Sequence, residues 1–264
     1  MCIRDSYIYF HRDLLTHGVS ASNLFELADV KDIEEKSPDA IYIFGPKDKG
    51  KRKNSFYFDE DNKLYVGYIA YSDEFDYFGY LKKMVLTLNN VINIKKGYLP
   101  IHGAGLSVVL KNDKTVNIVI LGDSGAGKSE SIEAFRSLAK DYIKEMTIVF
   151  DDMGSFRIRD DKVYAYGTEI GAFVRLDDLD AGYAFKQIDR SIFMNPDKVN
   201  SRLIMPVASF EEINKGYEVD FFLYADNYSA VLDNESSIEI LDDKKEALRI
   251  FKRGGRLAKG TTTE

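Results

Sequence analysis

The chain has 264 residues, of which 45% are hydrophobic, enough to build one large domain or two small ones around a buried core. Its formal net charge of -7 argues against nucleic acid or an anionic membrane surface as the main partner. No apolar run approaches the ~20 residues of a membrane span. Because Cys2 is the single cysteine, a disulfide framework is excluded. We therefore expect a cytoplasmic protein.

The first six residues, Met-Cys-Ile-Arg-Asp-Ser, resemble the translated end of a sequencing adapter. We expect the native sequence to begin near Tyr7 and leave residues 1–6 out of the fold prediction. On this interpretation Cys2 is foreign to the protein, and the chain is an internal fragment of a longer one.

Residues 7–76 predict a partial N-terminal α/β region, in which short strands alternate with turn-forming residues. From residue 77 to 264 strand and helix signals also alternate, and this pattern is typical of an α/β fold. We place a boundary between the two regions near residue 76. The predicted strands are 40–44, 55–58, 64–70, 106–110, 116–121, 147–150 and 219–224, and the predicted helices are 77–91, 130–138 and 244–251.

Residues 122–129 read Gly-Asp-Ser-Gly-Ala-Gly-Lys-Ser and fit the phosphate-binding loop pattern G-x-x-x-x-G-K-[ST]. The loop follows a predicted strand and opens a predicted helix, which is the context that this motif requires. Its glycines let backbone N–H groups point inward at a phosphate, and the helix N-terminus adds positive potential. The sequence predicts a nucleoside triphosphate site made of Gly122, Asp123, Ser124, Gly125, Ala126, Gly127, Lys128 and Ser129.

Within this loop, Lys128 is expected to reach the β- and γ-phosphates, and Ser129 to present its hydroxyl to a divalent metal. Asp151 and Asp152 end a predicted strand, as a metal-binding carboxylate of the Walker B type does. A turn or helix cap is the alternative for this pair. His102, Arg175 and Arg202 are common residues that carry little weight singly.

A series of motifs connects these positions and resembles ATP-dependent phosphoenolpyruvate carboxykinase. Residues 77–83, Tyr-Phe-Gly-Tyr-Leu-Lys-Lys, are similar to that family's Y-A-G-E-M-K-K, and residues 97–102 to its G-x-L-x-M-H. Residues 169–175 resemble E-G-G-C-Y-A-K, and residues 200–206 resemble N-T-R-x-x-Y-P. The resemblance runs in order from about residue 77 to the end of the chain.

The resemblance implies a P-loop nucleotide-binding core with a mixed β-sheet and flanking helices, which converts oxaloacetate and ATP to phosphoenolpyruvate, ADP and carbon dioxide. It implies Mg²⁺ with the ATP and a second cation, Mn²⁺. The metal ligands transferred by the resemblance are Lys83, His102, Ser129 and Asp152. Lys128, Arg175 and Arg202 are expected to neutralise the transferred group, Asp151 to orient metal-bound water, and Tyr77 to line the substrate pocket.

Two alternatives remain open. Residues 122–130 are closer to the P-loop of HPr kinase/phosphorylase, a protein-serine kinase with the same nucleotide-binding core; Asp151 or Asp152 then serves as general base. A nucleotide sensor without turnover is the other alternative, because the family's substrate-binding arginine motif has no counterpart here. The expected partner is therefore oxaloacetate or phosphoenolpyruvate, or a protein serine. The sequence does not separate ATP from GTP or pyrophosphate.

Overall fold

The computed structural model describes residues 2–3, 5–47, 54–72, 77–122, 125–138, 141–175, 191–194, 201–226 and 238–253. The chain forms two compact units. Unit 1 comprises residues 1–99 and 168–214, and unit 2 comprises residues 100–167 and 215–264. The sequence prediction divided the chain differently, near residue 76. Helix α3 (Phe78–Lys95) lies in unit 1 instead, because it packs on strands β3 and β5 of the N-terminal region.

Unit 1 contains a five-stranded sheet with the order β1-β2-β3-β5-β4. Strands β2, β3 and β5 run parallel, and β1 and β4 pair antiparallel at the two ends. All three strands predicted in this region are confirmed. The strands are β1 (Cys2–Ile3), β2 (Ser6–Phe10), β3 (Ala40–Phe44), β4 (Asn54–Asp59) and β5 (Leu64–Ile69).

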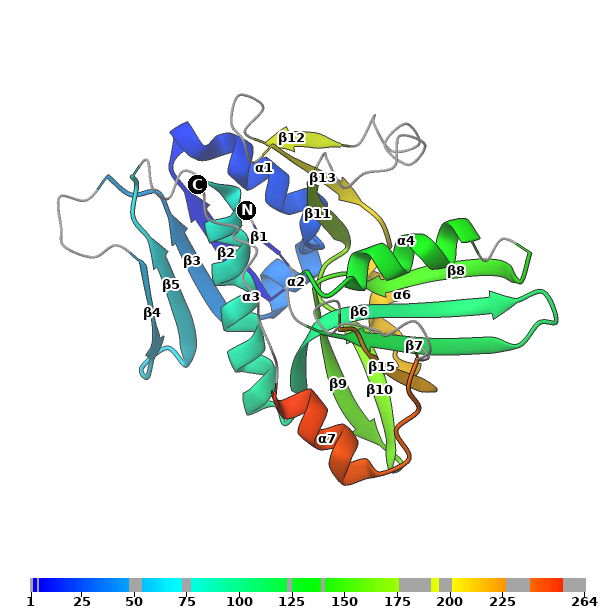
Figure 1. Cartoon of the computed structure of the whole chain (residues 1–264). Coiled ribbons are helices and arrows are strands. Elements are labelled where there is room, and N and C mark those ends of the chain that lie inside the picture. The colour runs from blue at the N-terminus through cyan, green and yellow to red at the C-terminus, as the bar shows by residue number, and fades with distance from the viewer. Residues whose placement is uncertain are drawn as a thin grey trace. The chain divides into compact units, whose positions relative to one another are not determined.

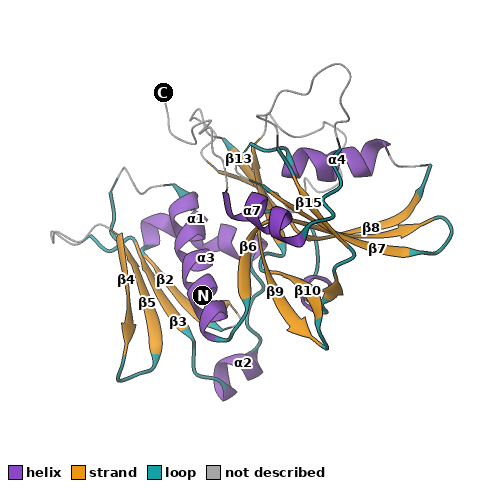
Figure 2. Ribbon diagram, turned by 60° about the horizontal axis from the view of Figure 1, so that its bottom comes forward, coloured by secondary structure: helices purple, strands orange, loops and turns teal. Residues whose placement is uncertain are grey.

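A second, three-stranded sheet of unit 1 has the order β11-β13-β12, with both pairs antiparallel. Helix α1 contacts β2, β11, β13 and α3, and Figure 2 shows it close to α3. The remaining elements of the unit are β11 (Gly171–Arg175), β12 (Ile192–Met194), β13 (Arg202–Pro206), η1 (Arg12–Leu14), α1 (Leu15–Leu24), α2 (Val30–Glu35) and α6 (Phe210–Asn214).

The helix predicted at 77–91 is confirmed as α3, which buries Phe78, Leu81, Val85 and Leu88 at helical spacing. Helix α1 was not predicted. Its sequence, LTHGVSASNL, carries one glycine and two serines, which have low helix propensity, so its helical state depends on packing between the two sheets.

Unit 2 is built on a mixed seven-stranded sheet with the path β14-β10-β9-β6-β7-β15, in which β8 also pairs with β6 (Figure 1). Strand β15 runs parallel to β7, and β7 and β8 are each antiparallel to β6. The strands are β6 (Leu99–Leu110), β7 (Thr115–Leu121), β8 (Ile143–Phe150), β9 (Met153–Arg159), β10 (Lys162–Gly167), β14 (Tyr217–Glu218) and β15 (Phe221–Tyr224).

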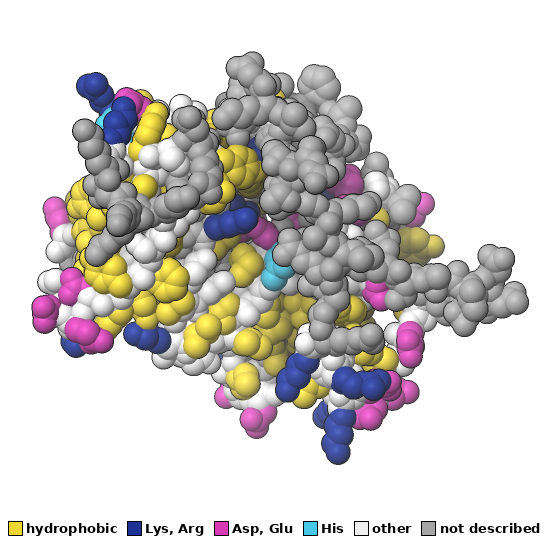
Figure 3. Space-filling model, turned by 60° about the vertical axis from the view of Figure 1, so that its left-hand side comes forward, with side chains coloured by type: hydrophobic (Ala, Val, Ile, Leu, Met, Phe, Trp, Pro, Cys, Tyr) yellow, Lys and Arg dark blue, Asp and Glu magenta, His cyan; other side chains and the backbone are white. Residues whose placement is uncertain are grey.

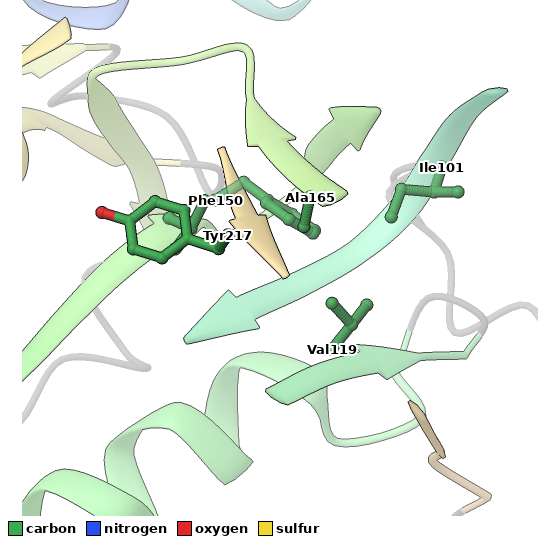
Figure 4. Close-up of a cluster of buried hydrophobic side chains, with 6 residues drawn as sticks. Ile101, Val119, Phe150, Ala165 and Tyr217 are labelled. Atoms are coloured by element: carbon green, nitrogen blue, oxygen red, sulfur yellow. The ribbon is translucent and has the colours of Figure 1, made fainter. Parts of the chain in front are cut away.

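Alternate residues of this sheet point to two separate clusters of buried side chains. Helix α4 (Lys128–Leu138) covers one face through Ile132, which packs with Leu106 and Ile120. On the other face Phe150 packs with Val119, Ile101, Ala165 and Tyr217 (Figure 4). The period of two along β7 therefore sends Val119 and Ile120 to opposite faces.

The predicted helices 130–138 and 244–251 are confirmed as α4 and α7 (Lys244–Arg253), and the fold is mixed α/β, as the sequence predicts. Figure 3 shows basic and acidic side chains scattered over the surface among hydrophobic ones. Exposed aromatic rings in unit 1 include Phe56 and Tyr57 of β4. Among the described helices, none combines the length and the apolar character needed to cross a membrane.

Candidate functional site

The carboxyl ends of three strands meet at one edge of the unit 2 sheet. Strands β7, β8 and β15 share one direction, since β7 and β8 are antiparallel to β6 and β15 is parallel to β7. Leu121, the last residue of β7, pairs with Gly103 of β6 and with Tyr224 of β15. The register therefore brings His102, the loop after Leu121 and the carboxylates after β8 to the same edge. Carboxyl ends of strands are where open α/β sheets bind ligands.

The predicted phosphate-binding loop joins β7 to the start of α4. Gly125 and Gly127 have φ angles of +81° and +97°, a left-handed conformation that glycine adopts without strain. Both the backbone N–H and the hydroxyl of Ser131 donate to the carbonyl of Gly127, at 2.9 and 2.7 Å. The first turn of α4 thus starts directly at the motif, with Lys128 buried at 8% exposure. Asp123 and Ser124 lie outside the described residues.

The two aspartates after β8 contact different predicted site residues. The hydroxyl of Ser129 donates to Asp151 Oδ1 at 2.9 Å. His102 Nε2 lies 3.1 Å from Asp152 Oδ1, and these side chains remain 42% and 39% exposed, so solvent reaches the pair. The backbone N–H of Gly103 in β6 donates to the carbonyl of Asp152, in the turn between β8 and β9, at 3.0 Å.

These groups suit a divalent cation that carries phosphate. Hydroxyl and carboxylate oxygens are ligands for Mg²⁺, and an imidazole with a carboxylate suits Mn²⁺. Among the described residues, no cluster of three or more His, Cys, Asp and Glu side chains forms a protein cage for a metal.

The other predicted site residues lie in unit 1. Arg202 Nε donates to the hydroxyl of Tyr77 at 3.3 Å, and the Arg202 guanidinium lies 5.5 Å from the centre of the Phe173 ring. Arg175 pairs with Arg202 across the β11–β13 ladder, so the two predicted arginines occupy facing positions. Lys83 is exposed on α3 and belongs to unit 1, whereas His102, Ser129 and Asp152 belong to unit 2.

Sequence reasoning gave no role to Lys82 and Glu169, the most deeply buried charged pair that unit 1 shows among its described residues. Lys82 Nζ lies 3.1 Å from Glu169 Oε1, with 9% and 6% of the side chains exposed. Helical spacing predicts a buried position for Lys82, because this residue falls on the same face of α3 as Phe78, Leu81 and Val85. No comparable periodic signal marks Glu169, which precedes β11.

The predicted residues thus form two groups, one at the sheet edge of unit 2 and one around Phe173 in unit 1. Comparison with protein-family models and with curated proteins gives no match for this chain.

Proposed function

We propose that this chain binds a nucleoside triphosphate, ATP with Mg²⁺, through unit 2 and transfers the terminal phosphoryl group. The observation that carries the proposal is the hydrogen bond from Ser129 to Asp151. It unites a hydroxyl of the loop motif with a strand-end carboxylate, beside Lys128 at the start of α4. Phosphate chemistry needs this combination of metal ligands and a cation.

Each group in unit 2 has a defined task in this proposal. The backbone of residues 122–127 and the N-terminus of α4 would bind phosphate oxygens. Lys128 would neutralise charge on the β- and γ-phosphates, Ser129 and Asp151 would hold Mg²⁺, and His102 and Asp152 would hold a second cation. Bound cations supply neutralisation of the charge that develops on the transferred group.

Oxaloacetate is the leading acceptor, because the motifs of residues 77–264 resemble phosphoenolpyruvate carboxykinase. Decarboxylation of oxaloacetate releases carbon dioxide and leaves an enolate, whose oxygen attacks the γ-phosphorus and expels ADP. The resemblance assigns Arg202 and Arg175 to neutralising the transferred group and Tyr77 to the substrate. A planar guanidinium suits this task because it binds carboxylate and phosphate oxygens with two parallel hydrogen bonds.

A protein serine is the second candidate acceptor. Asp151 already accepts a hydrogen bond from one serine hydroxyl, that of Ser129, and general-base catalysis toward an acceptor serine needs a carboxylate in that role.

The first experiment measures nucleotide binding and product formation with the same protein. Binding of a fluorescent ATP analogue with Mg²⁺ gives Kd, and phosphoenolpyruvate formed from oxaloacetate and ATP with Mn²⁺ gives turnover. In Lys128→Ala we expect turnover to fall by about 100-fold or more, as on removing a positioned transition-state donor. Lys114→Ala, an exposed lysine in the turn before β7, is the matched control and keeps wild-type values.

Each outcome decides between acceptors. Phosphoenolpyruvate that disappears in Lys128→Ala supports the carboxykinase-like reaction. Label from γ-³²P ATP on a protein serine, without phosphoenolpyruvate, supports the serine kinase. Nucleotide binding without either product supports a sensor, and equal binding by wild type and Lys128→Ala contradicts the nucleotide site itself.

A further inference from the structure

Strand β4 is the outermost strand of the five-stranded sheet in unit 1. It pairs with β5, and among the described elements no other strand pairs with it (Figure 1). The pairing is regular, since the six residues Asn54–Asp59 oppose Ile69–Leu64 one by one without a bulge. An edge strand of this kind presents a row of backbone N–H and C=O groups with which another strand can pair.

The sequence of β4 lacks the features that commonly prevent such pairing. Proteins protect edge strands with proline, lysine, a bulge or a very short strand. The six residues of β4, Asn-Ser-Phe-Tyr-Phe-Asp, include neither proline nor a basic residue. Phe56 and Tyr57 at its centre are 49% and 51% exposed, and they point to opposite faces of the sheet. The edge therefore offers backbone groups and apolar rings together.

The sequence on the two sides of the strand carries opposite charges. Residues 51–53, which precede β4 and lie outside the described residues, are Lys-Arg-Lys, and residues 59–61 are Asp-Glu-Asp. The acidic end forms a turn in which the Asn62 amide donates to Asp59 Oδ2 at 2.8 Å. Glu60 in this turn is 79% exposed. Three basic residues and three acidic residues thus flank the centre of β4.

This charge pattern favours antiparallel pairing with a second copy of the chain. In a parallel pair of two β4 strands the Lys-Arg-Lys runs would lie side by side, and like charges on neighbouring strands are destabilising. Antiparallel pairing about a two-fold axis brings the basic run of each copy beside the acidic run of the other. Both copies then use the same surface, as a symmetric dimer requires.

Strand geometry restricts the register of such a pair. Opposed residues of an antiparallel pair share a face of the sheet, and successive residues alternate between the faces. Phe56 lies on the face that carries α3, because it opposes Gly67, and Met84 of α3 lies over Gly67. In a joined sheet with α3 of both copies on one face, each residue opposes one that is an even number of positions away.

Among these registers, the charges select the one whose two-fold axis passes at Phe56. Phe56 then opposes Phe56 of the second copy, and residues 51, 52 and 53 oppose residues 61, 60 and 59, so that every basic residue faces an acidic one. Sliding the second copy by two residues in either direction leaves only one of the three basic residues opposite an acidic residue.

We propose that β4 joins two copies of this chain through an antiparallel strand pair centred on Phe56. The pair continues the sheets of the two copies into one sheet. The two Phe56 rings lie side by side, and Tyr57 of each copy faces Ser55 of the other. Cross-strand aromatic pairs and opposite charges stabilise such a pairing. The inference does not depend on the proposed phosphoryl transfer.

Sedimentation velocity of the 264-residue chain at several concentrations measures the association. We expect a reversible dimer with a Kd of about 10 µM, because a single strand pair makes a small interface. Phe56→Lys places two lysines opposite each other and should weaken the dimer by about 10-fold or more. Ile158→Lys, at a residue of β9 in unit 2 that is 76% exposed, is the matched control and leaves Kd unchanged.

Cysteine cross-linking tests the register. In a Cys2→Ser background, Phe56→Cys and Tyr57→Cys each carry a single cysteine. Cβ atoms of directly opposed residues lie about 4.5–5.5 Å apart, whereas those of diagonal neighbours lie about 7–8 Å apart, too far for a disulfide. In the proposed register Phe56 opposes itself and Tyr57 is diagonal to itself. We expect a covalent dimer on mild oxidation of Phe56→Cys and a much slower reaction of Tyr57→Cys.

A charge exchange tests the complementarity. Glu60→Lys faces Arg52 of the second copy with a like charge and should weaken the dimer by about 10-fold at low salt. Adding Arg52→Glu restores opposite charges and should restore the wild-type Kd. Glu211→Lys, at an exposed glutamate of α6, is the matched control.

Four results overturn the proposal. They are a chain that stays monomeric at its highest soluble concentration, a dimer whose Kd is unchanged in Phe56→Lys, faster cross-linking of Tyr57→Cys than of Phe56→Cys, and a Glu60→Lys dimer that Arg52→Glu does not restore. If Phe56→Lys fails to fold, the two cysteine variants decide, because neither introduces a charge into the strand.

Discussion

The two groups of site residues are assembled in different ways. In unit 2 the motif of residues 122–129 is continuous in sequence, and Ser129 of this motif contacts Asp151, which follows β8. In unit 1 the contacts join distant segments, Tyr77 to Arg202 and Lys82 to Glu169. Unit 2 residues His102 and Asp152 are about 40% exposed, whereas Lys82 and Glu169 are buried. Local motifs thus mark the accessible candidate site of unit 2, whereas tertiary packing creates the buried ion pair of unit 1.

The largest expected effect is on the core behind the unit 2 site. Phe150 is 2% exposed and directly precedes Asp151, so Phe150→Ala should lower the free energy of unfolding by about 3–5 kcal/mol. Chemical denaturation measures this loss, and hydrogen exchange should localise it to β6, β8 and β9. A loss of protection in unit 1 instead would contradict the separation of the two units.

A second-site change sharpens that test. A Cβ added at Gly105 would lie 2.3 Å from the Phe150 ring, so Gly105→Ala alone should destabilise the protein. In the Phe150→Ala background the same methyl group occupies the vacated space and should recover part of the loss. Additive losses would show that Phe150 does not fill the space beside Gly105.

The next largest effect is expected at Gly171, where two backbone segments approach each other closely. A Cβ at Gly171 would lie 2.1 Å from the backbone oxygen of Asn23, which cannot rotate away as a side chain does. We expect Gly171→Ala to cost about 1–3 kcal/mol of stability, as overpacking does. Urea denaturation measures this loss, and the Kd for nucleotide should stay at the wild-type value. A weaker nucleotide affinity would contradict the expected difference between the two groups of site residues.

A smaller effect is expected for Ser129, the proposed Mg²⁺ ligand. Ser129→Ala removes the hydroxyl that donates to Asp151, and we expect Mg²⁺-dependent affinity for the ATP analogue to fall by about 10-fold, as when a metal ligand's supporting contact is lost. Titration with and without EDTA measures the change. Ser137→Ala, on the exposed face of the same helix, is the control. Equal losses with and without Mg²⁺ would contradict the metal role of Ser129.

The smallest expected effect concerns Tyr42, a buried tyrosine of β3. Burial raises the pKa of Tyr42 well above its usual value, and its hydroxyl donates to the Val85 carbonyl at 3.3 Å. In the unfolded chain the hydroxyl ionises near pH ~10, so folding stability is full below this pH and decreases as the pH rises above it. Tyr42→Phe should cost about 1 kcal/mol at pH 7 and weaken the alkaline decrease.

Urea denaturation at neutral and alkaline pH measures both the loss of stability at pH 7 and the decrease of stability at alkaline pH. Tyr9→Phe, at a tyrosine with 58% exposure in the neighbouring strand β2, should change neither. An alkaline decrease of unchanged slope in Tyr42→Phe would show that other tyrosines cause it.

In unit 1 the sequence predicted β3, β4, β5 and α3, and in unit 2 it predicted most elements, because period-two and helical patterns depend on neighbours along the chain. It also marked the predicted phosphate-binding loop and the two aspartates after β8, because each of these motifs consists of consecutive residues. Helix α1, by contrast, has weak intrinsic propensity and exists through its contacts with two sheets. Only the tertiary structure decided that Glu169 lies beside Lys82 and that Arg202 donates to Tyr77. The partners in these contacts lie 87 and 125 positions apart in the chain. Patterns among neighbouring residues do not predict such pairings, because only folding brings the partners together.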